Sequence, residues 1–174
     1  MKFRQPKRVT MLKFFTETHR LYPNGSNENM DLQIVNSPLG HITITYSSLA
    51  PLVIDAADSL HLKSFVLEAK DAEILIKCSI HASESLQLTA KQIKCVSATN
   101  ITAVSKIKIN VEHLETEEGS RLSLSSTDAD STLNVNHLCN NGDVAIIGEL
   151  YGNVAQLSGT GTHDIHLRKN SYRR

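Results

Sequence analysis

The amino-acid sequence predicts an all-β protein, a single-domain parallel β-helix (β-solenoid) with three short strands in each rung of about 21 residues. Apolar and polar residues alternate in short runs such as Leu60-x-Leu62 and Ile107-x-Ile109, which puts both apolar side chains on one face of a strand. These runs recur at a nearly constant interval. No proline follows Pro51 and no glycine lies between residues 41 and 118, so hairpin signals are scarce in this stretch.

Three families of apolar residues define the repeat. The first is Leu60, Ile80, Ile101, Leu122 and Val144, with steps of 20, 21, 21 and 22 residues. The second is Phe65, Leu86, Ile107, Leu133 and Val154, with steps of 21, 21, 26 and 21. The third is Ile74, Ile93, Leu114, Leu138 and Ile165, with steps of 19, 21, 24 and 27. Upstream, Ile42-x-Ile44 and residues 52–54 predict one further rung, and coils of this kind stack about 4.8 Å apart.

The alternative fold is an antiparallel β-sandwich or barrel, whose strands also alternate and follow one another every ~8–12 residues. The regular interval and the missing turn glycines favour the β-helix. The 26-residue step coincides with the polar segment 125–131, which we expect to protrude as a loop from one corner.

Charge is distributed unevenly along the chain, although 18 basic and 18 acidic residues cancel. Residues 1–20 hold six basic groups and one acid, residues 168–174 hold four basic groups, and residues 21–167 hold 8 basic and 17 acidic groups, a net of −9. We expect a basic N-terminal cap and linker over residues 1–30, a β-solenoid over 31–167 and a basic tail over 168–174.

The N-terminal cap is predicted from the apolar residues of segment 7–22. Val9, Leu12 and Phe15 recur there at helical spacing, beside Lys7, Arg8, Lys13 and Arg20. Such an amphipathic segment would cover the open end of a solenoid. Binding to an anionic membrane surface is the alternative role.

Several classes of protein are disfavoured by composition. No run approaches the ~18 apolar residues of a membrane span, so no integral membrane segment is expected. An acidic, aromatic-poor body makes nucleic acid an unexpected partner. The N-terminus lacks the apolar core of a secretory signal, which predicts a cytoplasmic protein. Cys78, Cys95 and Cys139 match no disulfide or metal spacing and are expected to be structural thiols.

Glycine returns near the C-terminus in a recognisable order. Gly142-Asp143-Val144-Ala145-Ile146-Ile147-Gly148 precedes Leu157-Ser158-Gly159-Thr160-Gly161 and Asp164-Ile165-His166-Leu167. This resembles the S-G-S-G-D-[IV]-x-[IL] repeat of the head-GIN, auto-transporter adhesin-like family of bacterial β-helical domains, with Thr162-His163 inserted before the second aspartate. The glycine-free rungs of residues 60–118 are similar to hemagglutinin-type solenoids. The resemblance implies a β-helical fold and no catalytic residue.

Asp128 and Asp130 are the candidate catalytic residues. They lie two positions apart, so in an extended chain both carboxylates point the same way, ~6–7 Å apart and near the range of glycosidase pairs. A polysaccharide-active β-helix enzyme would need a cleft beside segment 125–131. An ordinary solvated turn has the same composition.

His41, His61 and His81 are the candidate metal ligands. They are spaced 20 residues apart, so in a solenoid they would approach one another on successive coils. An exposed histidine row that holds no metal is the simpler interpretation, since His61 lies between Leu60 and Leu62 and therefore points outward.

The function that these features predict is a non-enzymatic binding or structural module. Flat ladders of polar side chains would face a protein or glycan partner, and neither a cofactor nor a metal is required. A self-assembling scaffold with basic ends is a further alternative, in which the protein forms a homo-oligomer.

Overall fold

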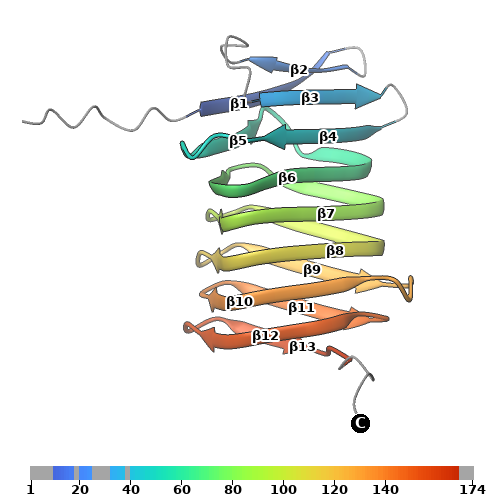
Figure 1. Ribbon diagram of the computed structural model, residues 1–174, viewed down its shortest axis with the longest axis vertical. Coiled ribbons are helices and arrows are strands. Elements are labelled where there is room, and N and C mark those ends of the chain that lie inside the picture. Colours follow the sequence, from blue (N-terminus) through green and yellow to red (C-terminus); the bar gives the residue numbers. More distant parts are fainter. Residues whose placement is uncertain (1–9, 18–19, 25–31, 38–39, 169–174) are drawn as a thin grey trace, which may run out of the picture.

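The computed structural model describes residues 10–17, 20–24, 32–37 and 40–168, which form one sheet of 13 strands and no helix. The strands are β1 (Thr10–Glu17), β2 (Arg20–Asn24), β3 (Leu32–Ser37), β4 (His41–Tyr46), β5 (Leu52–Ala56), β6 (Leu60–Ile76), β7 (Ile80–Cys95), β8 (Asn100–Thr116), β9 (Arg121–Ser126), β10 (Thr132–Asn140), β11 (Asp143–Gly148), β12 (Tyr151–Ser158) and β13 (Thr162–Ile165). The predicted parallel β-solenoid is confirmed, with about six coils stacked along one axis (Figure 1).

Each coil contributes to three faces, which the strand pairing defines. The first face consists of the beginnings of β6, β7 and β8 followed by β9, β11 and β13. The second face consists of β4, the middle of β6, β7 and β8, and the first halves of β10 and β12. The third face consists of β1, β5 and the last residues of β6, β7, β8, β10 and β12. The second face is turned toward the viewer in Figure 1.

The core is a set of apolar columns that run along the solenoid axis. The first family confirms the predicted register, because Leu60, Ile80, Ile101, Leu122 and Val144 are neighbours on successive strands. All five are buried. Alternation directs every second side chain inward, and stacking the coils removes those side chains from water.

The register that the second and third families predict is correct over the middle coils and wrong at the C-terminal end. Leu133 lies opposite Ile109 rather than Ile107, and Val154 lies opposite Val135 rather than Leu133. The error is two residues in each case. A shift of two keeps the same side chains inward, so alternation alone does not distinguish the two registers.

Ile165 also belongs to a different face from the one expected. It pairs with Ile146 on the first face, and Leu157 takes the expected place beside Leu138. A loop does form at a corner within the polar segment 125–131, but it covers residues 127–131 because Ser125 and Ser126 belong to β9. β9 ends at Ser126 and β10 begins at Thr132, six residues later, whereas the next coil makes the same corner in three, from Gly148 to Tyr151.

The N-terminal end is built from strands, although the helical spacing of Val9, Leu12 and Phe15 predicts an amphipathic cap there. β1 pairs in parallel with β5 and in antiparallel with β2, and β3 pairs in antiparallel with β4. Leu12 and Phe14, two residues apart, are buried against the core. The apolar residues of this short segment fit both the spacing of a helix and the alternation of a strand. Pairing with β5 favours the strand. Residues 1–9, 18–19 and 25–30 of the predicted cap and linker lie outside the described residues, as do residues 169–174 of the predicted basic tail.

Candidate functional site

His61 and His81 form a stacked pair on the outside of the first face. They are direct neighbours on β6 and β7, with ring centroids 4.7 Å apart and ring planes at 17°. His81 Nδ1 is hydrogen-bonded to the hydroxyl of Thr102, its neighbour on β8. Partial burial, and then the adjacent His61, lower the pKa of His81. The predicted approach of these two histidines on successive coils therefore occurs in the structure.

His41 lies apart from this pair, on the second face. It is the neighbour of Ser64, and its Nδ1 is 2.6 Å from the Ser64 hydroxyl. The expected row of three fails because the first coil is longer than the coil that follows it, so that His41 meets Ser64 instead of His61. Within the described ranges no three His, Cys, Asp or Glu side chains converge on a point where a metal ion would bind.

A second histidine pair lies on the third face. His113 and His137 are neighbours on β8 and β10, with ring centroids 4.8 Å apart in an edge-on arrangement, and His137 Nε2 is 2.7 Å from the Ser158 hydroxyl. This pair was not predicted, because the loop between β9 and β10 lengthens the interval between the two coils. The sequence does contain a signal for this pair. Leu114 and Leu138, which directly follow the two histidines, are neighbours in one core column, so the histidines before them are neighbours as well.

Asp128 and Asp130 form a turn in the corner loop. Asp128 Oδ1 accepts a hydrogen bond from the backbone N–H of Asp130 at 2.8 Å, an arrangement typical of aspartate at a loop. The Ser126 hydroxyl donates to the carbonyl oxygen of Asp128 at 3.1 Å and thereby holds the start of the loop. Asp128 thus has a structural partner within its own turn.

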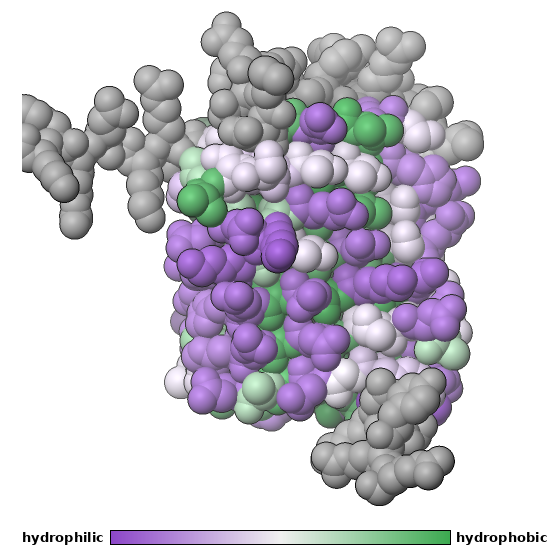
Figure 2. Space-filling view, viewed as in Figure 1, coloured by the Kyte–Doolittle hydropathy of each residue, from purple (hydrophilic) through white to green (hydrophobic). Residues whose placement is uncertain are grey.

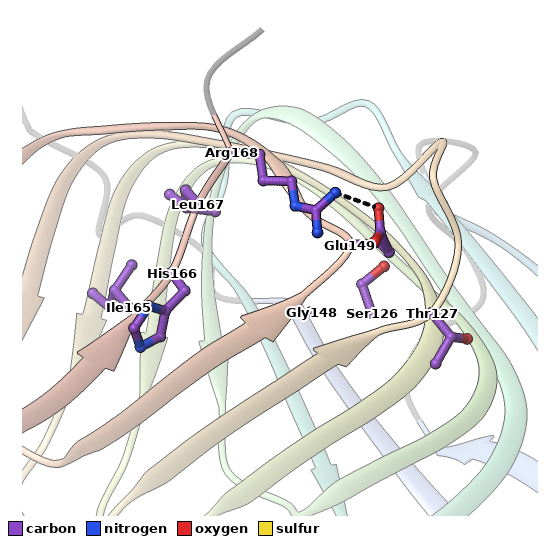
Figure 3. Close-up of a pocket in the computed structure, with 8 residues that line it drawn as sticks. All are labelled: Ser126, Thr127, Gly148, Glu149, Ile165, His166, Leu167 and Arg168. Carbon is purple, nitrogen blue, oxygen red and sulfur yellow. Dashed lines mark hydrogen bonds and ion pairs between the residues drawn. The ribbon is translucent and has the colours of Figure 1, made fainter.

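A hollow of about 730 Å³ lies beside this loop, at the C-terminal end of the solenoid (Figure 3). Its lining is Ser126, Thr127, Gly148, Glu149, Ile165, His166, Leu167 and Arg168. Neither Asp128 nor Asp130 lines it.

The acid of this hollow, Glu149, is already paired. Its Oε2 lies 3.0 Å from Arg168 Nη1 (Figure 3). The pKa of the Arg168 guanidinium is raised by its hydrogen bond with Tyr151 and by the charge of Glu149. The hollow therefore presents an ion pair and apolar side chains rather than two opposed carboxyl groups.

An asparagine row lies on the outside of the second face. Asn110, Asn134 and Asn153 are direct neighbours on β8, β10 and β12, Thr89 on β7 precedes them, and the three amides are exposed. A parallel row of Lys108, Thr132 and Tyr151 runs beside it. Hydrophilic side chains cover most of this face (Figure 2). The row was not predicted, because the interval between its members changes from one coil to the next.

A different asparagine has a structural role inside a corner. Asn140 is buried. Its Oδ1 accepts hydrogen bonds from the Thr116 hydroxyl at 2.6 Å and from the Gly142 N–H at 3.0 Å. Its Nδ2 donates a hydrogen bond to the carbonyl oxygen of Thr162 at 2.8 Å. All of these polar groups are satisfied within the protein. This site joins three successive coils and is not open to a ligand.

The three cysteines, all of them among the described residues, are free thiols. Burial, followed by the charge of Asp55, raises the pKa of Cys78 to about 12, and burial alone raises that of Cys95 to about 12. Cys139 is half-buried. A pKa this high keeps Cys78 and Cys95 protonated, which is the opposite of a nucleophile or a metal ligand.

Comparisons with protein-family models, with curated proteins and with solved structures find no match to this chain. None of them bears on the resemblance of the C-terminal rungs to head-GIN domains, which stays a prediction. Nowhere in the described residues is there a helix long and apolar enough to cross a membrane.

Proposed function

We propose that the protein is a non-enzymatic binding module whose ligand lies along the outside of the second face. The observation that carries this proposal is the row of Thr89, Asn110, Asn134 and Asn153 on four successive coils. Corresponding residues of a parallel ladder are about 4.8 Å apart. The protein therefore presents a repeating line of hydrogen-bonding groups along its long axis.

The chemistry of this row favours a glycan over a charged ligand. An asparagine amide both donates and accepts hydrogen bonds, which suits hydroxyl groups, and it carries no charge. Tyr151 at the end of the neighbouring row adds an aromatic ring with a polar tip. An extended polysaccharide offers repeated hydroxyl groups to such a line. A protein segment in extended conformation is the alternative ligand.

Binding is favoured over catalysis by the geometry of the corner loop. A glycosidase mechanism requires two carboxyl groups that face a substrate. Asp128 instead accepts a hydrogen bond within its turn, and the acid of the neighbouring hollow, Glu149, is paired with Arg168. These contacts support a ligand that is bound and not cleaved.

The test is a screen for binding to immobilised and soluble polysaccharides, followed by titration calorimetry on any ligand found. The triple variant Asn110→Ala, Asn134→Ala, Asn153→Ala should weaken binding by about tenfold or more, since each lost hydrogen bond contributes about 1 kcal/mol. Asn100→Ala, an exposed asparagine on the first face, is the matched control and should bind as the wild type does.

Two results would overturn the proposal. One is equal affinity of the triple variant and the wild type for the same glycan. The other is release of reducing ends from a polysaccharide that stops with Asp128→Asn, because that result would identify an enzyme.

A further inference from the structure

An asparagine followed directly by glycine occurs twice in the chain, at residues 24–25 and 141–142. In this dipeptide the peptide nitrogen of the glycine reaches the asparagine side chain more easily than in other sequences, because glycine has no side chain to hinder it. Gly25 lies outside the described residues. Asn141 and Gly142 form the corner between β10 and β11, and the structure gives the contacts of both residues.

The nitrogen of Gly142 is held by a neighbouring side chain. Its N–H donates a hydrogen bond to Oδ1 of the buried Asn140 at 3.0 Å. A peptide nitrogen becomes a nucleophile when it loses its proton, and a hydrogen bond to a buried acceptor favours the protonated form. The folded protein therefore withholds this nitrogen from reaction.

The side-chain amide of Asn141 is held by the coil that follows. Its Oδ1 accepts hydrogen bonds from the N–H of Thr160 at 3.2 Å and from the Thr160 hydroxyl at 3.5 Å. Its Nδ2 lies 3.8 Å from Sγ of Cys139. Attack on the carbonyl carbon of this amide moves both its oxygen and its nitrogen, so the reaction has to break these contacts.

The backbone of the corner is bonded on both sides. The N–H groups of Asn141 and Asp143 donate to carbonyl oxygens of the coil before it, at 2.9 and 3.0 Å. The carbonyl oxygen of Gly142 accepts from the N–H of Thr162, on the coil after it, at 3.0 Å. Closing a ring between Asn141 and Gly142 rotates the backbone between them, which requires the corner to separate from both neighbouring coils.

We propose that Asn141 is a site of spontaneous deamidation, which the folded protein protects and which reacts when its corner separates from the neighbouring coils. The hydrogen bond from Gly142 to Asn140 is the main protecting contact, because it involves the attacking atom itself. The modification needs only water and is independent of the ligand proposed for the second face.

The reaction has two steps. Hydroxide removes the proton of the Gly142 N–H and the nitrogen attacks Cγ of Asn141, so that a new C–N bond forms and the bond from Cγ to Nδ2 breaks. Nδ2 takes a proton from water and leaves as ammonia, which restores the hydroxide and leaves a five-membered succinimide ring. Water then opens the ring at either carbonyl, giving aspartate, or isoaspartate with the backbone running through Cβ and Cγ.

The isoaspartate product does not fit the folded corner, because it adds one carbon atom to the backbone before Gly142. A Cβ on Gly142 would lie only 2.4 Å from the carbonyl oxygen of Ser120 on the coil before. A Cβ on Gly161, on the coil after, would lie 2.2 Å from the carbonyl oxygen of Gly142. A protein that forms isoaspartate while the corner is open should therefore not close it again.

The rate of deamidation at mildly alkaline pH, followed by peptide mass spectrometry, tests the proposal in an Asn24→Gln background that removes the other Asn-Gly sequence. The protein unfolded in guanidinium chloride and a synthetic peptide of residues 136–146 should react at similar rates. The folded protein should react at least about tenfold more slowly, since an opening free energy of about 1.4 kcal/mol already gives that factor. Equal rates in the folded and unfolded protein, or no reaction in the unfolded protein, would overturn the proposal.

Two variants test the protecting hydrogen bond in the folded protein. Asn140→Ala removes the acceptor of the Gly142 N–H and should deamidate several-fold faster than the wild type. Thr116→Val is the matched control, because it removes the other hydrogen bond of the same Oδ1 and leaves that of Gly142 in place. Rates are corrected for the unfolded fraction of each variant, and equal acceleration in both variants would overturn the proposal. The comparison of folded and unfolded wild type remains decisive if Asn140→Ala does not fold.

Refolding tests the consequence of the modification. Protein that has formed isoaspartate at position 141 in denaturant should not recover the native circular dichroism or unfolding midpoint after dilution. Asn141→Asp carries the same charge on a normal backbone and should refold, which separates the effect of backbone length from that of charge. Full refolding of the isoaspartate form would show that the corner accepts the longer backbone and would overturn this part of the proposal.

Discussion

His61 and His81 lie face to face on adjacent coils, with ring centroids 4.7 Å apart and planes at 17°. The parallel register of β6 and β7 makes them direct neighbours, so the fold holds two imidazoles in contact. Two neutral rings stack without electrostatic cost, but two protonated rings repel one another. Protonation of this pair is therefore linked to the stability of the fold.

Stability should decrease at mildly acidic pH. Burial, and then His61, lower the pKa of His81 below its ordinary value of 6.5. As the pH falls below 6.5, the unfolded chain takes up a proton that the folded chain resists, so the free energy of unfolding decreases. Above that range both states are neutral at this residue and the contribution vanishes.

Urea unfolding midpoints measured from about pH 8 to about pH 5 test this linkage. His81→Gln should flatten the decrease, and His61→Gln should flatten it only in part, because burial is the larger cause of the shift. An unchanged pH dependence in His81→Gln would contradict the assignment.

Gly152 should be intolerant of substitution. Its φ is +147°, and a Cβ there would lie 1.8 Å from the carbonyl oxygen of Leu133 on the coil before. Gly119 has a φ of +84°, but the nearest atom to its Cβ would be 3.8 Å away. Gly119→Ala should cost about 1 kcal/mol from backbone conformation, and Gly152→Ala clearly more. Thermal unfolding of both variants gives the comparison, and equal losses would refute the close approach of these coils.

The middle of the solenoid was predictable because one apolar column recurs with almost no change in interval. The steps from Leu60 to Ile80 and from Ile80 to Ile101 are nearly equal, and each residue is the neighbour of the next. The register at Leu133 was not predictable in the same way. The corner loop adds three residues, and both Leu133 and Val135 satisfy the same alternation.

The candidate sites, like the register, were predictable in the regular coils and not where the coil length changes. His61 and His81 were identifiable because the coil between them is regular, whereas His41 precedes a longer coil and lies on another face. The asparagine row and the pair of His113 and His137 span the corner loop, which changes the interval. A constant interval therefore locates neighbouring side chains only where the coil length is constant, and across the corner loop the apolar pair Leu114 and Leu138 has to set the register.

The buried Asn140 should be coupled to Thr116. Their side chains share a 2.6 Å hydrogen bond. Asn140→Ala leaves the buried Thr116 hydroxyl without this partner, at a cost of about 1–3 kcal/mol. In Thr116→Val the Asn140 Oδ1 keeps its hydrogen bond from the N–H of Gly142, so this variant should lose less. Thr116→Val and Asn140→Ala should each destabilise the fold, and the double variant should lose less than the sum. A double-mutant cycle of urea unfolding measures the difference. Simple additivity would show that the two side chains do not act together.

The three cysteines should differ sharply in reactivity in the folded protein. Cys78 and Cys95 are buried at core positions, and burial raises the pKa of each thiol to about 12. Since the thiolate is the reacting species, both should resist a disulfide reagent at neutral pH, while the half-buried Cys139 reacts. Titration with such a reagent should count one fast thiol in the native protein and three after unfolding. Cys139→Ser should abolish the fast phase, and a fast phase that persists in this variant would place Cys78 or Cys95 within reach of solvent.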